Sequence, residues 1–183
     1  EQKYELSLTN LEVRVMFQKL IKGWFGRTNG ASDEFVDALL NGDIKAMNYY
    51  MNKIALATFS YFDVGNKPSE YIEPERFYHG FVLGLMVGQR EDYVIKSNRE
   101  SGFGRYDIIM LPCNIENKRL SAIVIEFKVH DSDEEKSLVD TVAAAHRQIE
   151  EKRYDEEILA LGIEKERIRH YGFAFDGKQV LIG

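Results

Sequence analysis

The feature that most constrains this chain is a pair of apolar runs with charged residues inside them. The runs span residues 106–111 and 121–129, and the polar loop between them contains Pro112, so the pattern predicts an antiparallel β-hairpin. Because successive side chains point to opposite faces of a strand, Glu126 and Lys128 share one face with Val124. Burying a carboxylate or an ammonium is unfavourable by several kcal/mol unless a partner compensates it. The pair therefore needs either a structural partner or a chemical role.

Asp107 offers such a role. It stands one residue into the first run, after the glycine-containing turn at residues 102–105. An antiparallel neighbour can bring its carboxylate close to Glu126, and a bound divalent cation relieves the repulsion between two carboxylates at that distance. Lys128 would then stand beside the water that the cation activates. The alternative is a structural ion pair between Glu126 and Lys128 at the end of a strand.

These residues carry a resemblance to a known family. Gly104-Arg105-x-Asp107, followed by Glu126-x-Lys128, resembles the PD-(D/E)XK nuclease superfamily, most closely the nuclease-like domain at the C-terminus of bacterial AAA-ATPase-like proteins. Residues 75–85, 96–100, 148–154 and 171–175 also resemble that domain, so the likeness covers about residues 70–183. It implies an α/β (α+β) fold, with a restriction-endonuclease-like mixed β-sheet flanked by helices.

The resemblance also implies an activity and a set of site residues. The activity is that of a metal-dependent nuclease, which hydrolyses the phosphodiester bonds of DNA with Mg²⁺ or Mn²⁺. Asp107, Glu126 and the backbone carbonyl of Phe127 would be metal ligands. Lys128 would orient the attacking water and stabilise its hydroxide form by charge.

The helix predicted to begin at Pro74 offers a further ligand. Glu75 and His79 are four residues apart and therefore lie on one helix face. In RecB-like members of the superfamily a histidine on the helix before the sheet completes the metal shell, which favours His79. In other branches a glutamate does so, which favours Glu75. The alternative for His79 is a structural histidine among its aromatic neighbours.

A long helix after Lys128, predicted to begin at Ser132 or Asp133, directs the amide of Gln148 inward along its apolar stripe. The resemblance implies that Gln148 and Tyr154 border the active site, as in the helix of RecB-like nucleases that carries a glutamine and a tyrosine. Tyr154 follows at a longer spacing than that motif has. The alternative for Gln148 is a core-edge amide bonded to the backbone.

Helical periodicity predicts a small helical subdomain in residues 1–69, ahead of the nuclease-like domain in residues 70–183. Its helices are expected after a cap at Thr9 or Asn10 as far as Gly26, from Ser32, and from Asp43, and a turn region at residues 63–69 marks the boundary. A strand is expected at residues 92–100, and Asp176-Gly177 predicts a hairpin turn before residues 179–182.

Glu100 falls at the end of the strand expected at residues 92–100. There it would either join the acidic cluster or pair with Arg105.

The net charge of −6 argues against a dedicated nucleic-acid binder, whose phosphate contacts normally come with a basic face. Lys96, Arg99 and Arg105 are the candidates for a local basic patch that binds nucleic acid. The charge also favours an alternative function, in which the domain does not cleave but serves as a regulatory or nucleic-acid-binding module. A third interpretation is an interaction domain whose charged trio is structural.

Other sequence features limit the class of protein to which this chain can belong. No apolar run has the length of a membrane span, and no basic-then-apolar signal opens the chain, so we expect a cytoplasmic protein without a membrane partner. The single cysteine, Cys113, excludes an internal disulfide and a zinc cluster. The chain begins with Glu1, from which we expect a longer parent protein with an upstream ATPase-like domain. The sequence leaves the oligomeric state open.

Overall fold

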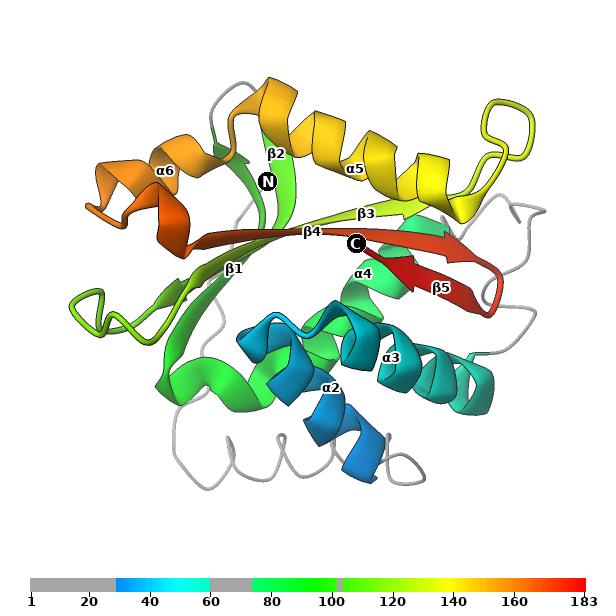
Figure 1. Ribbon diagram of the computed structural model, residues 1–183, viewed down its shortest axis with the longest axis horizontal. Helices are drawn as coiled ribbons and strands as arrows, with labels where there is room; N and C mark the ends of the chain where they lie inside the picture. Colours follow the sequence, from blue (N-terminus) through cyan, green and yellow to red (C-terminus); the bar gives the residue numbers. More distant parts are fainter. Residues whose placement is uncertain (1–28, 60–73, 102–103) are drawn as a thin grey trace, which may run out of the picture.

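The computed structural model describes residues 29–59, 74–101 and 104–183. These ranges contain a five-stranded mixed sheet with helices on both faces (Figure 1). In spatial order the strands are β1 (Tyr93–Ser101), β2 (Gly104–Pro112), β3 (Ala122–Val129), β4 (Ile168–Asp176) and β5 (Gln179–Ile182). Only β3 and β4 pair in parallel among these neighbours. The predicted α+β fold with a mixed, helix-flanked sheet is confirmed.

The helices form a layer on each face of the sheet. Helices α2 (Asn29–Asn41), α3 (Ile44–Thr58) and α4 (Pro74–Leu85) cover one face, and α5 (Leu138–Lys152) and α6 (Asp155–Ala160) cover the other (Figure 1). Two short 3-10 helices, η1 (Met86–Glu91) and η2 (Lys165–Arg167), lead into β1 and β4. Within the described ranges, no helix has both the length and the apolarity needed to cross a membrane.

Alternation along the central strands divides the apolar residues between two cores. On β3, Ile125 and Phe127 pack toward α2, α3 and α4, whereas Val124 packs toward α5 and α6. All three side chains are fully buried. Because both faces of β3 are covered at Glu126, its buried carboxylate must find partners on neighbouring elements, whereas Lys128 near the strand end is partly exposed.

Helix α3 attaches to β5 through two asparagines. Asn48 accepts from the backbone N–H of Ile182 at 2.9 Å and donates to its carbonyl at 2.7 Å. Asn52 makes the same pair of bonds with Val180. The described helices of the first segment therefore pack on the sheet, and a separate subdomain in residues 1–69 stays a prediction. The helix expected at residues 10–26 and the turn at 63–69 lie outside the described residues.

Two predicted helix starts are wrong. The described part of helix α2 already includes Asn29, three residues before the start expected at Ser32, and Ala31 in this added turn is buried. Helix α5 begins at Leu138 and not at Ser132 or Asp133. By contrast, Asp43 does cap α3, since its side chain accepts from the backbone N–H of Ala46.

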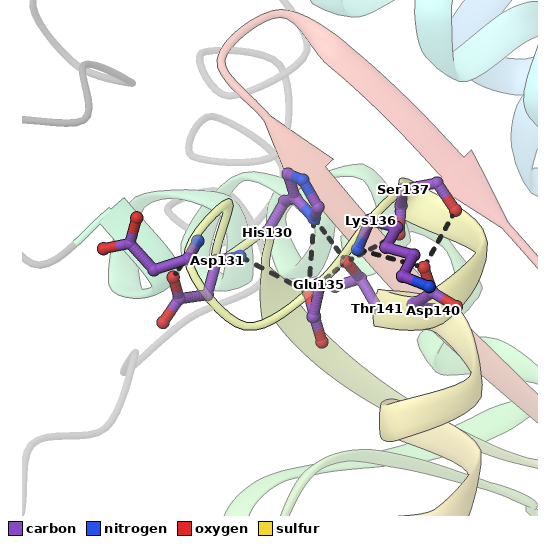
Figure 2. Close-up of polar contacts among 8 residues, drawn as sticks. His130, Asp131, Glu135, Lys136, Ser137, Asp140 and Thr141 are labelled. Atoms are coloured by element: carbon purple, nitrogen blue, oxygen red, sulfur yellow. Dashed lines mark hydrogen bonds and ion pairs between the residues drawn. The ribbon is translucent and has the colours of Figure 1, made fainter.

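The late start of α5 is explained by polar contacts in the loop before it (Figure 2). The side chain of Glu135 contacts Nδ1 of His130 at 3.2 Å and accepts from the hydroxyl of Thr141. Oδ2 of Asp140 accepts from Ser137 Oγ at 3.1 Å, and also from a loop N–H. Acidic side chains that accept from nearby N–H and O–H groups compete with helix formation, so the loop closes before α5 begins.

Candidate active site

Strands β2 and β3 separate where the charged residues lie. Their ladder runs as far as the pair Ile108 and Ile125. One residue further on, the carboxylate of Asp107 accepts from the backbone N–H of Phe127 at 2.8 Å. A side chain thus takes the place of a backbone partner, and the carboxylate of Asp107 lies in the gap between the strands, beside Glu126.

Gln148 bridges Glu126 and Lys128 from helix α5. Its Nε2 donates to Oε1 of Glu126, and its Oε1 accepts from Nζ of Lys128 at 2.6 Å. Lys128 Nζ and Glu126 Oε1 are themselves 3.8 Å apart. An amide satisfies a carboxylate and an ammonium at the same time in only one orientation, so the bridge fixes all three side chains relative to one another.

Gly172 explains how Gln148 reaches the strand. It lies opposite Glu126 in the parallel β3–β4 register. A Cβ at Gly172 would be 3.0 Å from the Cβ of Ala145 and 3.0 Å from the carbonyl oxygen of Val142, so α5 lies against the sheet at this point. This role of Gly172 was not predicted from the sequence. The signal for it was the alternation of small residues with aromatic ones in residues 171–175.

Burial raises the pKa values of both carboxyls, and repulsion adds to the effect at Glu126. The pKa of Glu126 rises to about 8 because the group is buried and the charges of Asp107 and Glu75 are near, with Lys128 opposing. Burial also raises the pKa of Asp107. The hydrogen bond from the N–H of Phe127 and nearby positive charges lower this pKa, but burial has the larger effect. Oε2 of Glu126 is buried and has no hydrogen-bond partner among the described residues. Two adjacent carboxyls with an unpartnered oxygen favour a bound cation.

The donor set fits a hard divalent cation that keeps water ligands. No three His, Cys, Asp or Glu side chains in the described ranges form a group that could hold a metal ion. Mg²⁺, however, is usually held by one or two carboxylates together with water and substrate phosphate, so Asp107 and Glu126 are sufficient. The carbonyl of Phe127 stays a predicted ligand.

The two candidate ligands on α4, His79 and Glu75, come from the face of the sheet opposite to α5 and Gln148 (Figure 1). Nε2 of His79 lies 2.9 Å from Oγ of Ser97 and 3.3 Å from the backbone oxygen of Asp107. The ring also packs edge-on against Phe127, at 5.6 Å between centroids. Glu75 is close enough for its charge to raise the pKa of Glu126. Both residues stay candidates. Ser97, which positions His79, was not foreseen from the sequence.

Tyr154 belongs to the same network as Gln148. Its hydroxyl is 3.3 Å from Nε2 of Gln148 and donates to the carbonyl of Arg105 at 2.6 Å. The structure therefore brings Tyr154 to the site despite its longer spacing in the sequence. This contact holds the segment that leads into Asp107.

The structure describes the side chains of Lys96 and Arg105, two of the residues predicted to form a basic patch. Lys96 forms an ion pair with Glu157 on α6, so its charge is compensated. Arg105 is exposed, and Lys152 lies beside the preceding residue: a Cβ at Gly104 would be 2.9 Å from the Cγ and Cδ atoms of Lys152. The side chains of Arg99 and Glu100 lie outside the description. Lys152 was missed because only the fold brings the end of α5 to the start of β2.

A comparison with protein families places this arrangement in a known group. The model of the PD-(D/E)XK nuclease superfamily matches residues 73–183, which contain the five strands and every residue of the candidate site. Separate comparisons with curated proteins and with solved structures found no match. Nucleases of this superfamily generally use divalent metal ions. Because the matched region exceeds half of the sequence and the sheet is the expected one, the chain belongs to the PD-(D/E)XK nuclease superfamily.

Proposed function

We propose that this chain is a divalent-metal-dependent nuclease that hydrolyses phosphodiester bonds in DNA, with Mg²⁺ or Mn²⁺ as the cofactor. The observation that carries the proposal is the buried Oε2 of Glu126, which lies beside the carboxyl of Asp107 and has no hydrogen-bond partner within the part of the chain that the structure describes. A fold that needed only an ion pair with Lys128 would have no reason to bury two neighbouring carboxyls together.

In this proposal Asp107 and Glu126 hold the cation, assisted by the carbonyl of Phe127 and by His79 or Glu75. A bound divalent cation supplies Lewis-acid polarisation of the phosphate and lowers the pKa of a water molecule. The ammonium of Lys128, held by Gln148 at 2.6 Å, places positive charge where negative charge develops during hydrolysis.

The position of Gln148 and Tyr154 supports a place in the RecB-like branch. Both side chains meet at the carboxylate of Glu126, one directly and the other through the amide. An upstream ATPase-like domain is part of the same proposal, because a net charge of −6 gives the chain little affinity of its own for a polyanion. A partner that concentrates DNA near the site would compensate for that charge.

A cleavage assay tests the proposal. The chain is incubated with labelled single-stranded DNA, duplex DNA and RNA in chelator, Mg²⁺, Mn²⁺ or Ca²⁺. We expect cleavage of DNA in Mg²⁺ or Mn²⁺ that chelator and Asp107→Asn both abolish. The matched control is Asp33→Asn, an exposed carboxylate on α2, which should cleave like the parent. Binding without cleavage in every metal would favour the regulatory alternative.

A further inference from the structure

A pocket of about 270 Å³ lies between α4, η1 and β1, apart from the network of Glu126, Lys128 and Gln148. Its volume is slightly below that of pockets that take drug-sized molecules, so it suits one flat ring system with its sugar. The lining residues are Gly80, Leu83, Gly84, Arg90, Ile95 and Ser97.

Gly80 keeps this pocket open. Glycine disfavours a helix interior relative to alanine, and Gly80 stands in the middle of α4. A Cβ at this position would meet no atom of the described residues within 4 Å, so packing does not require glycine here. Because Gly80 has no side chain, the space over the helix backbone at this position stays part of the pocket.

The pocket walls have the chemistry that a nucleobase needs. Leu83 and Ile95 are half-buried apolar side chains that can cover the faces of a ring. The exposed guanidinium of Arg90 and the hydroxyl of Ser97 are polar groups at the edge. A guanidinium both stacks on aromatic rings and donates to base acceptors.

A chain of contacts links the pocket to the candidate active site. Ser97 lines it and also contacts Nε2 of His79, which in turn lies 3.3 Å from the backbone oxygen of Asp107. A DNA strand with a phosphate at Asp107 can therefore place a neighbouring base on the α4 side of the sheet.

From this arrangement we propose that the pocket binds one unpaired nucleobase of the DNA strand being cleaved. The inference rests on the proposed nuclease function and narrows its substrate to single-stranded DNA or frayed duplex ends, because a paired base cannot leave its stack to enter a pocket without a loss of stacking energy.

Binding is measured by fluorescence anisotropy in Ca²⁺, with a labelled single-stranded oligodeoxynucleotide and a matched oligonucleotide that contains abasic sites. The parent should bind the base-containing strand about tenfold more tightly. Gly80→Leu fills the pocket and should remove this preference. Arg90→Ala should reduce it to about threefold, because the apolar walls remain. The control is Gly30→Leu, at a helix position whose Cβ also meets open space, which should keep the full preference.

Circular dichroism first establishes that each variant is folded. If Gly80→Leu does not fold, Arg90→Ala still tests the pocket. If Arg90→Ala and folded Gly80→Leu both keep the full preference for the base-containing strand, the proposal that the pocket binds a nucleobase is rejected. The outcome for the nuclease is read separately, from cleavage by the parent chain. If Gly80→Leu loses the preference for the base-containing strand but the parent does not cleave DNA, the proposed base pocket is supported and the proposed nuclease activity is rejected.

Discussion

At the scale of single residues, the buried carboxyl of Glu126 sets how stability depends on pH. Its pKa rises from an ordinary value of 4.5 to about 8 in the folded chain, so the native state binds a proton more tightly than the unfolded state does. The resulting stabilisation is complete below the unfolded pKa and is lost as pH rises through the folded pKa. Without metal, this residue should therefore destabilise the fold by up to about 5 kcal/mol as pH rises past 8.

Urea unfolding in chelator at pH 5 and pH 8 measures this effect, with Glu126→Gln as the comparison. The amide does not titrate, so the variant should gain stability relative to the parent as pH rises. A difference in unfolding free energy that is the same at both pH values would mean that Glu126 titrates near its ordinary pKa.

Lys128→Ala separates catalysis from structure at the same site. We expect a loss of cleavage of about 100-fold or more, because the variant removes the positive charge that would stabilise the negative charge developing during hydrolysis. Manganese affinity should stay the same or improve, since a competing cation beside the two carboxylates is gone. The Lys128 side chain is 29% exposed, so the thermal melt should shift little. A large loss of stability that Mn²⁺ does not restore would identify a structural ion pair.

At the scale of elements, the close packing of α5 on β4 is what places Gln148. Gly172→Ala adds a Cβ 3.0 Å from Ala145 and from a backbone carbonyl of α5. We expect a loss of about 1–3 kcal/mol in unfolding free energy and reduced cleavage, because the helix must move away from Glu126. Gly30→Ala is the control, since its Cβ meets open space and alanine favours a helix. Parent-like cleavage by Gly172→Ala would show that the position of α5 does not matter.

The strands could be predicted from the sequence because alternation and turn residues are local signals. The hairpin expected at residues 106–111 and 121–129 is observed as β2 and β3. The start of α5 could not be predicted, since it depends on how Glu135 meets His130 and Thr141 after the loop closes. The separation of β2 from β3 at Asp107 could not be predicted either. It depends on a tertiary contact, in which the Asp107 side chain and not a backbone carbonyl accepts from the N–H of Phe127.

For the candidate site, spacing alone indicated that Asp107, Glu126 and Lys128 could meet, and the structure brings them together with Gln148. Their catalytic and metal-binding roles stay predictions. The pairing of Lys96 with Glu157 joins elements far apart in the sequence, so no local pattern could reveal it.

At the scale of the whole molecule, the net charge of −6 predicts DNA binding through few phosphate contacts. Lys152, exposed beside Gly104, is one expected contact. Lys152→Ala should weaken binding to all DNA sequences alike and lower the slope of log affinity against log salt by about 1. Anisotropy titrations over a range of salt concentrations measure the slope. Lys45→Ala, an exposed lysine on α3, should leave it unchanged, and equal slopes for the two variants would remove Lys152 from the interface.

The most direct test of the account is calorimetric titration of the chain with Mn²⁺ at pH 7 in two buffers of different ionisation enthalpy. Because burial and repulsion hold the pKa of Glu126 at about 8, most of this carboxyl is protonated at that pH. We predict that Mn²⁺ binding releases close to one proton per chain, seen as a buffer-dependent enthalpy, and that Asp107→Asn abolishes binding. No binding at millimolar Mn²⁺, or equal binding by Asp107→Asn, would contradict a metal site at Asp107 and Glu126.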